Sequence, residues 1–190
     1  ASVGFGGSCF RKDILNLVYL CRAQGLNEVA DYWHAVVNIN EYQKNRFVQT
    51  MLAAMFNTLA GKRIALFGFA FKANTSDTRE TPAINVARKL MGEKAEVVIT
   101  DPQAHENARN DLSGLPAIFA DDPYEAAVSC DAIAIITEWD VYRTLDYERI
   151  FKSMRKPAFI FDGRSILDHR QLYETGFNVY GIGKVLLTHF

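Results

Sequence analysis

Short apolar runs alternate with segments of helical character from residue 61 to residue 190, and this alternation restricts the fold more than any other feature. Several runs are apolar without interruption, as is typical of parallel strands covered on both faces. Thr81-Pro82 and Asp122-Pro123 each place a capping residue before a proline that suits the first helical position. We therefore predict a doubly wound α/β domain with a parallel sheet. The expected strands are 63–67, 96–100, 117–120, 132–137, 158–161 and 178–182, and the expected helices are 82–91, 123–129, 147–154 and 169–175.

A glycine-rich loop at residues 4–8 leads into an earlier predicted helix and places a cysteine at its start. Apolar residues recur with a helical period downstream, so we expect Ser8 to cap this helix and Cys9 to take its first position. There the helix dipole favours negative charge, and Lys12 and Asp13, three and four residues on, lie on the face of Cys9. The pattern indicates a reactive thiol, with a buried structural cysteine as the alternative.

A second, much longer helix is expected after Gly25, with Asn27 as its cap, over about residues 28–59. It contains neither proline nor glycine, and such length favours a spine that joins domains or packs against a second subunit, although a plain core helix also fits. We place the domain boundary at residue 60: residues 1–60 form the end of a helical region, and 61–190 form the α/β domain.

Net charge, apolar runs and cysteine content exclude some classes of function. The net charge of −1 provides no general attraction to nucleic acid or anionic lipid, and the chain lacks an apolar run long enough to span a membrane. Three cysteines form no paired framework, which favours a reducing, cytoplasmic setting in which Cys21 and Cys130 are small core residues. No spacing typical of metal ligands is evident. Because the chain opens on Ala1 within what reads as a working loop, we expect a fragment of a longer protein.

The predicted sheet is Rossmann-like, but the dinucleotide fingerprint is missing. The loop after the first strand reads Gly68-Phe69-Ala70-Phe71-Lys72 instead of G-x-G-x-x-G. Asp101, which ends the second predicted strand, occupies the position at which dinucleotide-binding folds carry an acid that hydrogen-bonds the ribose. We interpret it as a turn residue before Pro102, with a ligand role as the alternative.

The strand-end loops nevertheless carry residues suited to a phosphorylated ligand. Residues 69–80 form an unusually long loop, in which Phe71 suits a base or sugar and Lys72 and Arg79 suit phosphates. Arg164 follows a later strand and should reach the same edge of the sheet. Solvated surface charges are the alternative reading of each cation.

Four motifs resemble the UDP-glucose 6-dehydrogenase family in its animal-type form. They are GFGGSCF-x-KD at 4–13, GFAFK-x-x-T-x-DTRE at 68–80, TEWD-x-Y-x-x-LDYERI at 137–150 and KPAFIFDGR at 156–164. The resemblance implies the carboxy-terminal part of such an enzyme: the end of the central helical and dimerisation region, followed by a Rossmann-like UDP-binding domain. It further implies NAD as cofactor, UDP-glucose as substrate and a homo-oligomer, at least a dimer, through the long helix. The family's NAD domain would lie outside this sequence.

The same resemblance assigns roles to individual residues. Cys9 matches the nucleophile, and Asp13 matches a carboxylate that organises the thiol and the hydrolytic water. Arg11 stands where the family carries an uncharged amide. The positions that match contacts to UDP-glucose are Ala1, Ser2, Val3, Gly4, Phe5, Gly6, Phe71, Lys72 and Arg164, and those that match contacts to NAD are Phe10, Arg11, Lys12 and Arg79.

Two other functions remain open from the sequence. A related dehydrogenase of UDP-N-acetylmannosamine or GDP-mannose would share the thiol loop and the Rossmann-like domain. The chain could also serve as a non-catalytic UDP-binding and dimerisation module. For the UDP-glucose 6-dehydrogenase reading we expect this chain alone to bind a UDP-sugar without turning it over, since it contains no complete dinucleotide fingerprint.

Overall fold

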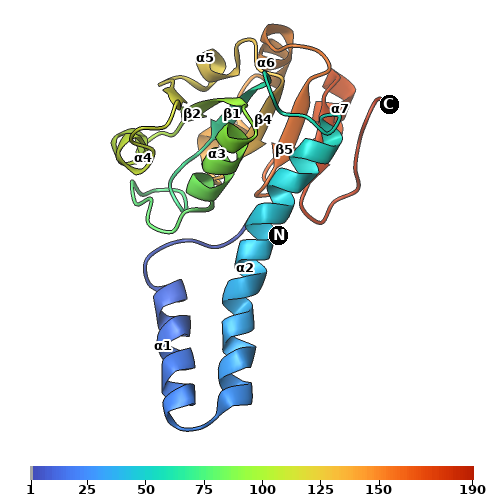
Figure 1. The fold of residues 1–190 in the computed structure, drawn as a ribbon. Coiled ribbons are helices and arrows are strands. Elements are labelled where there is room, and N and C mark those ends of the chain that lie inside the picture. Colours follow the sequence, from blue (N-terminus) through green and yellow to red (C-terminus); the bar gives the residue numbers. More distant parts are fainter. Residues whose placement is uncertain (1) are drawn as a thin grey trace.

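The computed structural model describes residues 2–190, and its centre is a six-stranded parallel sheet in the order β3-β2-β1-β4-β5-β6 (Figure 1). This is the strand order of doubly wound dinucleotide folds, so the predicted fold class is confirmed. The strands are β1 (Arg63–Phe67), β2 (Glu96–Thr100), β3 (Ile118–Phe119), β4 (Ala132–Ile135), β5 (Phe159–Asp162) and β6 (Asn178–Gly181).

Helices cover both faces of the sheet because neighbouring side chains of each strand point to opposite sides. In β1, Ile64 and Leu66 join one apolar cluster, whereas Ala65 and Phe67 join the other. The first cluster includes side chains of α2 and α3, and the second includes those of α5, α6 and α7. The helices of the sheet domain are α3 (Pro82–Gly92), α4 (His105–Asp111), α5 (Pro123–Ala127), α6 (Tyr147–Ser153) and α7 (His169–Thr175), with a 3₁₀ turn at Asp140–Arg143.

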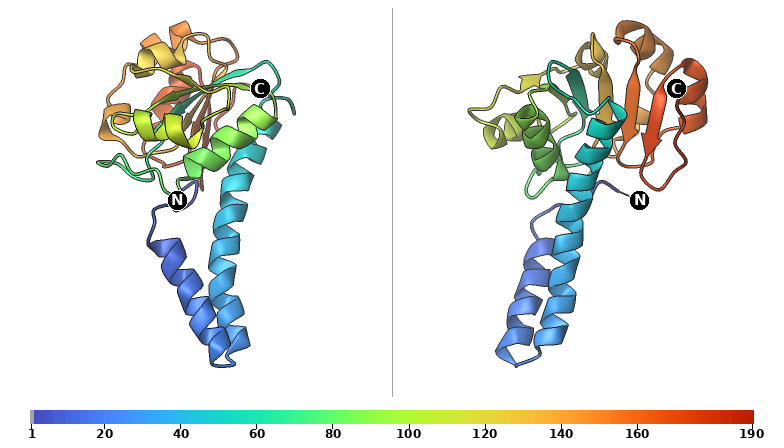
Figure 2. Two further views of the ribbon diagram at one scale, coloured as in Figure 1. Left: turned by 60° about the vertical axis from the view of Figure 1, so that its left-hand side comes forward. Right: turned by 45° about the vertical axis from the view of Figure 1, so that its right-hand side comes forward.

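Two helices precede the sheet and form a hairpin that projects from it, α1 (Phe10–Ala23) and α2 (Asn27–Ala54) (Figures 1 and 2). The hairpin has a small core of its own around Ile14, Val18 and Val37. The C-terminal part of α2 instead packs on the sheet through Phe47 and Met51. One helix therefore joins the hairpin to the α/β domain, and the boundary at residue 60 stays a prediction.

The ends of the two long helices differ from the sequence prediction. The N-cap of α1 is Cys9 rather than Ser8, and that of α2 is Leu26 rather than Asn27; neither makes a side-chain capping bond. The helix α2 ends at Ala54 instead of residue 59, because Phe56 and Asn57 adopt positive φ angles of 65° and 57°.

Two short helical elements were missed, α4 and the 3₁₀ turn at Asp140–Arg143, because short polar segments carry too little apolar periodicity to reveal them. The predicted caps Thr81 and Asp122 are confirmed, since their side chains accept bonds from Ala83 N and Tyr124 N. Among residues 2–190, no helix is long and apolar enough to cross a membrane.

Candidate sugar-nucleotide site and thiol loop

The segment from Ser2 to Cys9 crosses the edge of the sheet at which the strands end. Val3 N donates to Gly163 O at 2.8 Å, just beyond β5, and Gly7 N donates to Arg79 O at 2.9 Å, in the loop after β1. The thiol loop and the two predicted phosphate loops therefore meet in one place, which is where open α/β sheets bind ligands. Ala1 lies outside the described residues.

The helix α2 fixes this segment from its other side. Asn40, which is only 5% exposed, accepts from Phe5 N at 2.8 Å and donates through Nδ2 to Phe5 O at 3.1 Å. Gln43 donates through Nε2 to Ser2 O at 3.1 Å. Sequence reasoning missed both residues. The only signal was a polar stretch within the long helix, which does not reveal its partner 35 residues away.

Glycine is required at two positions of the loop because the loop after β1 lies too close for a Cβ atom. A Cβ at Gly6 would lie 2.6 Å from Glu80 O and 3.0 Å from the Cβ of Phe71. Gly7 has a φ of +88° and lies directly against the ring of Phe71. Phe71, predicted to contact substrate, thus also forms the surface on which the thiol loop rests.

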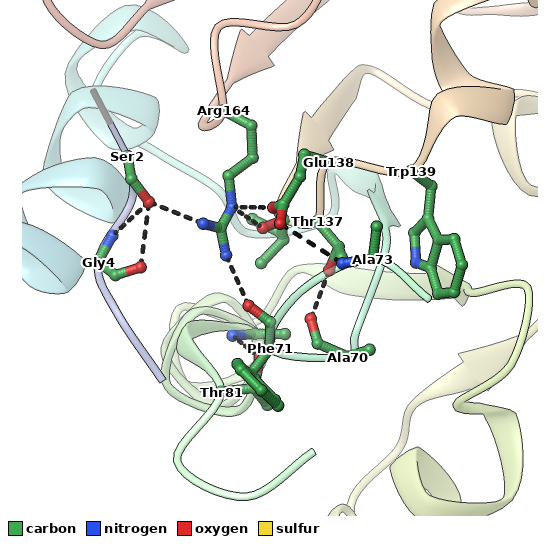
Figure 3. A network of polar contacts seen from close by, with 12 residues as sticks. Ser2, Gly4, Ala70, Phe71, Ala73, Thr81, Thr137, Glu138, Trp139 and Arg164 are labelled. Carbon is green, nitrogen blue, oxygen red and sulfur yellow. Dashed lines mark hydrogen bonds and ion pairs between the residues drawn. The ribbon is translucent and has the colours of Figure 1, made fainter. Parts of the chain in front are cut away.

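Arg164 joins four segments at the centre of the site (Figure 3). Its guanidinium donates through Nε to Ile136 O at 2.6 Å, through Nη1 to Ser2 Oγ at 2.9 Å and through Nη2 to Phe71 O at 3.1 Å. Glu138 Oε2 lies 3.2 Å from Nε as an ion partner, and the Arg164 side chain is only 13% exposed. Burial lowers the pKa of Arg164 and Glu138 opposes that shift. The predicted phosphate ligand is therefore also the residue that holds the loops together.

Asp162 fixes the turn that carries Arg164. Its carboxylate accepts from the backbone N–H groups of Arg164 and Leu167, each at 3.0 Å, and lies 3.0 Å from His169 Nε2. Burial alone would raise the pKa of Asp162, but the bonds from His169 and from the two N–H groups outweigh it and lower that pKa.

Lys72 differs from Arg164 in being available to a ligand. Its side chain is exposed, with Nζ 5.6 Å from the centre of the Phe71 ring. Among residues 2–190 it takes part in no ion pair. An aromatic ring beside an uncommitted ammonium group suits a phosphorylated sugar or base.

Cys9 lies at the open end of the loop. It is exposed, and its Sγ is 3.7 Å from Ser8 Oγ. Lys12 and Asp13 are exposed one turn further along α1, and within the described part of the chain no hydrogen bond or ion pair joins either side chain to the sulfur. Asp13 is connected to Cys9 only through its backbone, N to O at 2.8 Å.

Three of the residues assigned to NAD, Phe10, Arg11 and Lys12, follow Cys9 directly in the sequence, and the fourth, Arg79, accepts from Gly7 N of the thiol loop. Arg79 donates to both carboxylate oxygens of Asp77, and this bond is the main cause of the lowered pKa of Asp77 and the raised pKa of Arg79. Arg11 pairs with Glu80 at 3.2 Å. Phe10 is exposed, with its ring centre 4.7 Å from that of Phe5.

The other two cysteines are buried, as predicted. Cys130 donates its S–H to Ala126 O at 3.0 Å, and burial raises its pKa to about 11. Cys9 is thus the accessible thiol of this chain.

The carboxylate of Asp101 binds the backbone N–H groups after β1, at the position where a dinucleotide fold carries the G-x-G-x-x-G motif that this chain lacks. One carboxylate oxygen accepts from the N–H groups of Phe69 at 2.6 Å and Ala70 at 3.0 Å, and from Trp139 Nε1 at 3.1 Å. The other oxygen accepts from Gln103 N and Ala104 N. The N–H groups after β1, which in a dinucleotide fold face the pyrophosphate, are therefore occupied by the protein's own carboxylate. This supports its interpretation as a turn residue.

The fold and the site together define a class of protein. It is a Rossmann-like domain in which a cysteine-bearing loop packs against the loops that follow β1 and β5. The model of the UDP binding domain of the UDP-glucose/GDP-mannose dehydrogenase family matches residues 65–169, and that of the family's central domain matches residues 1–42. The chain belongs to the UDP-glucose/GDP-mannose dehydrogenase family.

Relatives agree with this assignment. The chain is 53% identical to UDP-glucose 6-dehydrogenase 5 of Oryza sativa subsp. japonica and 51% identical to UDP-glucose 6-dehydrogenase 4 of Arabidopsis thaliana. Each match covers 98% of this chain and 43% of the relative, so the chain spans less than half the length of these proteins. A solved UDP-glucose dehydrogenase from Pyrobaculum islandicum is similar at a TM-score of 0.80 and 31% identity, covering 97% of this chain and 39% of that one.

Proposed function

We propose that this chain is the sugar-nucleotide-binding and nucleophile-bearing part of an NAD-dependent UDP-glucose 6-dehydrogenase, which oxidises UDP-glucose to UDP-glucuronate. The observation that carries the proposal is the fixed loop of Ser2 to Gly7, held across the strand ends by Arg164, Asn40 and Gln43 and ending at an exposed thiol. Identity above 50% to relatives with this name supports the choice of substrate.

In this proposal the diphosphate lies between Lys72 and Arg164, and the chain from Ser2 to Gly6 runs along the nucleotide and the sugar. Lys72 supplies an uncommitted charge, whereas Arg164 keeps its bonds to the loops and faces the ligand as a preorganised cation. The Phe71 ring covers the same surface.

Cys9 then performs covalent catalysis on C6. After the first oxidation yields an aldehyde, Cys9 Sγ bonds to its carbon and the carbonyl oxygen takes a proton, giving a thiohemiacetal. The second oxidation yields a thioester; water attacks its carbonyl carbon, the C–S bond breaks, and the thiol and the carboxylate product are released. Asp13, exposed one turn from Cys9, is proposed to orient that water.

NAD, when bound, accepts the two hydrides. The residues around the thiol suit such a polyanionic cofactor in part: Lys12 is an exposed cation and Phe10 offers an exposed ring. The other two cations are already paired, Arg79 with Asp77 and Arg11 with Glu80. The N–H groups after β1 do not suit this cofactor, because Asp101 occupies them. The pyrophosphate of NAD is therefore proposed to be held mainly by residues outside this chain.

The hairpin of α1 and α2 is proposed to form a dimer interface in the cytoplasmic enzyme. It exposes large apolar side chains along its length, namely Tyr19, Leu20, Leu26, Val29, Tyr32, Ile39 and Tyr42. Gel filtration with light scattering tests this: Ile39→Glu and Tyr32→Glu should shift the full protein toward monomer.

A dehydrogenase of another sugar nucleotide is the second candidate. The solved UDP-D-ManNAc dehydrogenase from Pyrococcus horikoshii is similar at a TM-score of 0.70 and 27% identity. Its lower identity favours UDP-glucose for this chain. A non-catalytic UDP-binding and dimerisation module is the third.

Titration calorimetry of the 190-residue chain tests the proposal. UDP-glucose should bind, and GDP-mannose should bind at least about tenfold more weakly if the site reads uracil and glucose. Lys72→Ala should weaken UDP-glucose binding, and the chain alone should not reduce NAD at 340 nm. Equal binding to the parent and to Lys72→Ala, or stronger binding of GDP-mannose, would contradict the assignment.

A further inference from the structure

A cavity separate from Cys9 and Lys72 lies between the C-terminal half of α2 and the turn after β6. Its volume is about 330 Å³, within the range of small-molecule sites, which begins at roughly 300 Å³. Neither Arg164 nor any residue of the thiol loop lines it. The part of α2 that forms one wall is the part that runs along the sheet (Figure 2).

The wall of this cavity is aromatic. The rings of Phe161 and Tyr180 stack with centres 5.0 Å apart, and Phe47 meets Phe161 edge-on at 6.5 Å. Tyr180 is partly buried, and that burial raises its pKa; its phenol, which is neutral near pH 7, can donate a hydrogen bond. These surfaces suit a flat, unsaturated ring.

The charge around the cavity has one sign. Arg46 and Lys184 line it, and none of its lining residues is acidic. Across residues 2–190, neither cation takes part in an ion pair with a carboxylate. Gln43 and Thr50 add an amide and a hydroxyl. Two uncompensated cations beside an aromatic wall favour a ligand that is both planar and anionic.

We propose that this cavity binds a planar aromatic anion of the size of an aryl phosphate, which is smaller than a sugar nucleotide. The ring would lie on Tyr180, and the anion would face Arg46 and Lys184. The site is separate from the proposed sugar-nucleotide site but adjoins it through one side chain, since Gln43 lines the cavity and also donates to Ser2 O in the thiol loop.

The test titrates the ¹⁵N-labelled 190-residue chain with phenyl phosphate and follows amide shifts by NMR. Shifts should concentrate at Gln43 to Thr50 and Tyr180 to Leu186. Charge reversal in the double variant Arg46→Glu with Lys184→Glu should weaken binding at least about tenfold, because the anion would meet two like charges. Both side chains are exposed, so the fold should persist, as checked by circular dichroism.

Controls separate this site from the proposed function. Phenol, which lacks the anion, should bind more weakly; Lys72→Ala and saturating UDP-glucose should leave phenyl phosphate binding unchanged. Conversely, the double variant should bind UDP-glucose as the parent does. No binding of phenyl phosphate, its displacement by UDP-glucose, or its loss in Lys72→Ala would overturn the inference, whatever the outcome for UDP-glucose itself.

Discussion

The two halves of the thiol loop differ in how they are held. Residues 2–7 are fixed by Arg164, Asn40, Gln43 and two backbone bonds, whereas Cys9 and the first turn of α1 are exposed. The fixed half preorganises a surface for the nucleotide, and the open half leaves the thiol free for a substrate and a cofactor. The residues that shape the proposed nucleotide site are therefore held in place by this chain itself. The chemistry at Cys9, in contrast, depends on substrate and cofactor groups that must approach an exposed thiol.

The largest effect should come from the open half. In the full protein, Cys9→Ala should lower glucuronate production at least about a thousandfold, since no thioester can form. UDP-glucose binding should change little. Steady-state assays and calorimetry measure the two effects, with Cys21→Ala as the control that retains turnover. Near-normal turnover without Cys9 would mean that another group is the nucleophile.

Alkylation compares the accessible thiol with the buried ones. Iodoacetamide should label Cys9 first, because Cys130, with a pKa of about 11, has about one thiol in a thousand ionised at pH 8 and is buried. Saturating UDP-glucose should slow the labelling of Cys9. Peptide mapping that finds Cys130 labelled first would reverse the comparison.

Variants of Arg164 and Lys72 should show that one residue mainly holds the loops and the other mainly binds the ligand. Arg164→Ala should cost about 2–4 kcal/mol of unfolding free energy, because it removes three hydrogen bonds and leaves Ile136 O and Phe71 O without that donor. Lys72→Ala should leave stability within about 0.5 kcal/mol and still weaken UDP-glucose binding about thirtyfold. Urea unfolding and calorimetry distinguish them; equal stability losses would refute the division of roles.

Asn40 tests the clamp from α2. Asn40→Ala removes both bonds to Phe5 and should cost about 1–3 kcal/mol of stability and weaken UDP-glucose binding. Asn45→Ala on the same helix is the matched control, since Asn45 Oδ1 has no hydrogen-bond partner within residues 2–190. If the two variants behave alike, the clamp does not hold the loop.

The smallest effect should be on the free energy of unfolding at low pH. The pKa of Asp162 is lower in the folded state than in the unfolded chain, so its contribution is complete above the unfolded pKa and is lost as pH falls through the folded pKa. Asp162→Asn should therefore flatten the loss of stability at low pH, as followed by urea unfolding between pH 2 and pH 6. An unchanged slope would show that Asp162 gains nothing from its partners.

Much of the architecture was predictable because it is encoded locally. The apolar runs, the caps at Thr81 and Asp122 and the break at Gly25 specify elements through neighbours a few residues apart. The same local patterns showed that the dinucleotide fingerprint is absent and that a helix begins beside Cys9, although the structure makes Cys9 its N-cap instead of its first residue. Helix ends were predicted less well, because Phe56 and Asn57 adopt positive φ angles that their sequence does not require.

What only the tertiary structure decided is which polar groups meet. Asn40 reaches Phe5 across 35 residues, Asp101 reaches Phe69 across 32, and Arg164 reaches Ser2 across 162. The sequence by itself determined that a cysteine loop exists and that Phe71, Lys72 and Arg164 would lie at one edge of the sheet. That the cysteine loop crosses the same edge was decided by the tertiary structure. The sequence could not show that Arg164 is already occupied and Lys72 is not, because a hydrogen bond depends on atoms placed within about 3 Å by the whole fold.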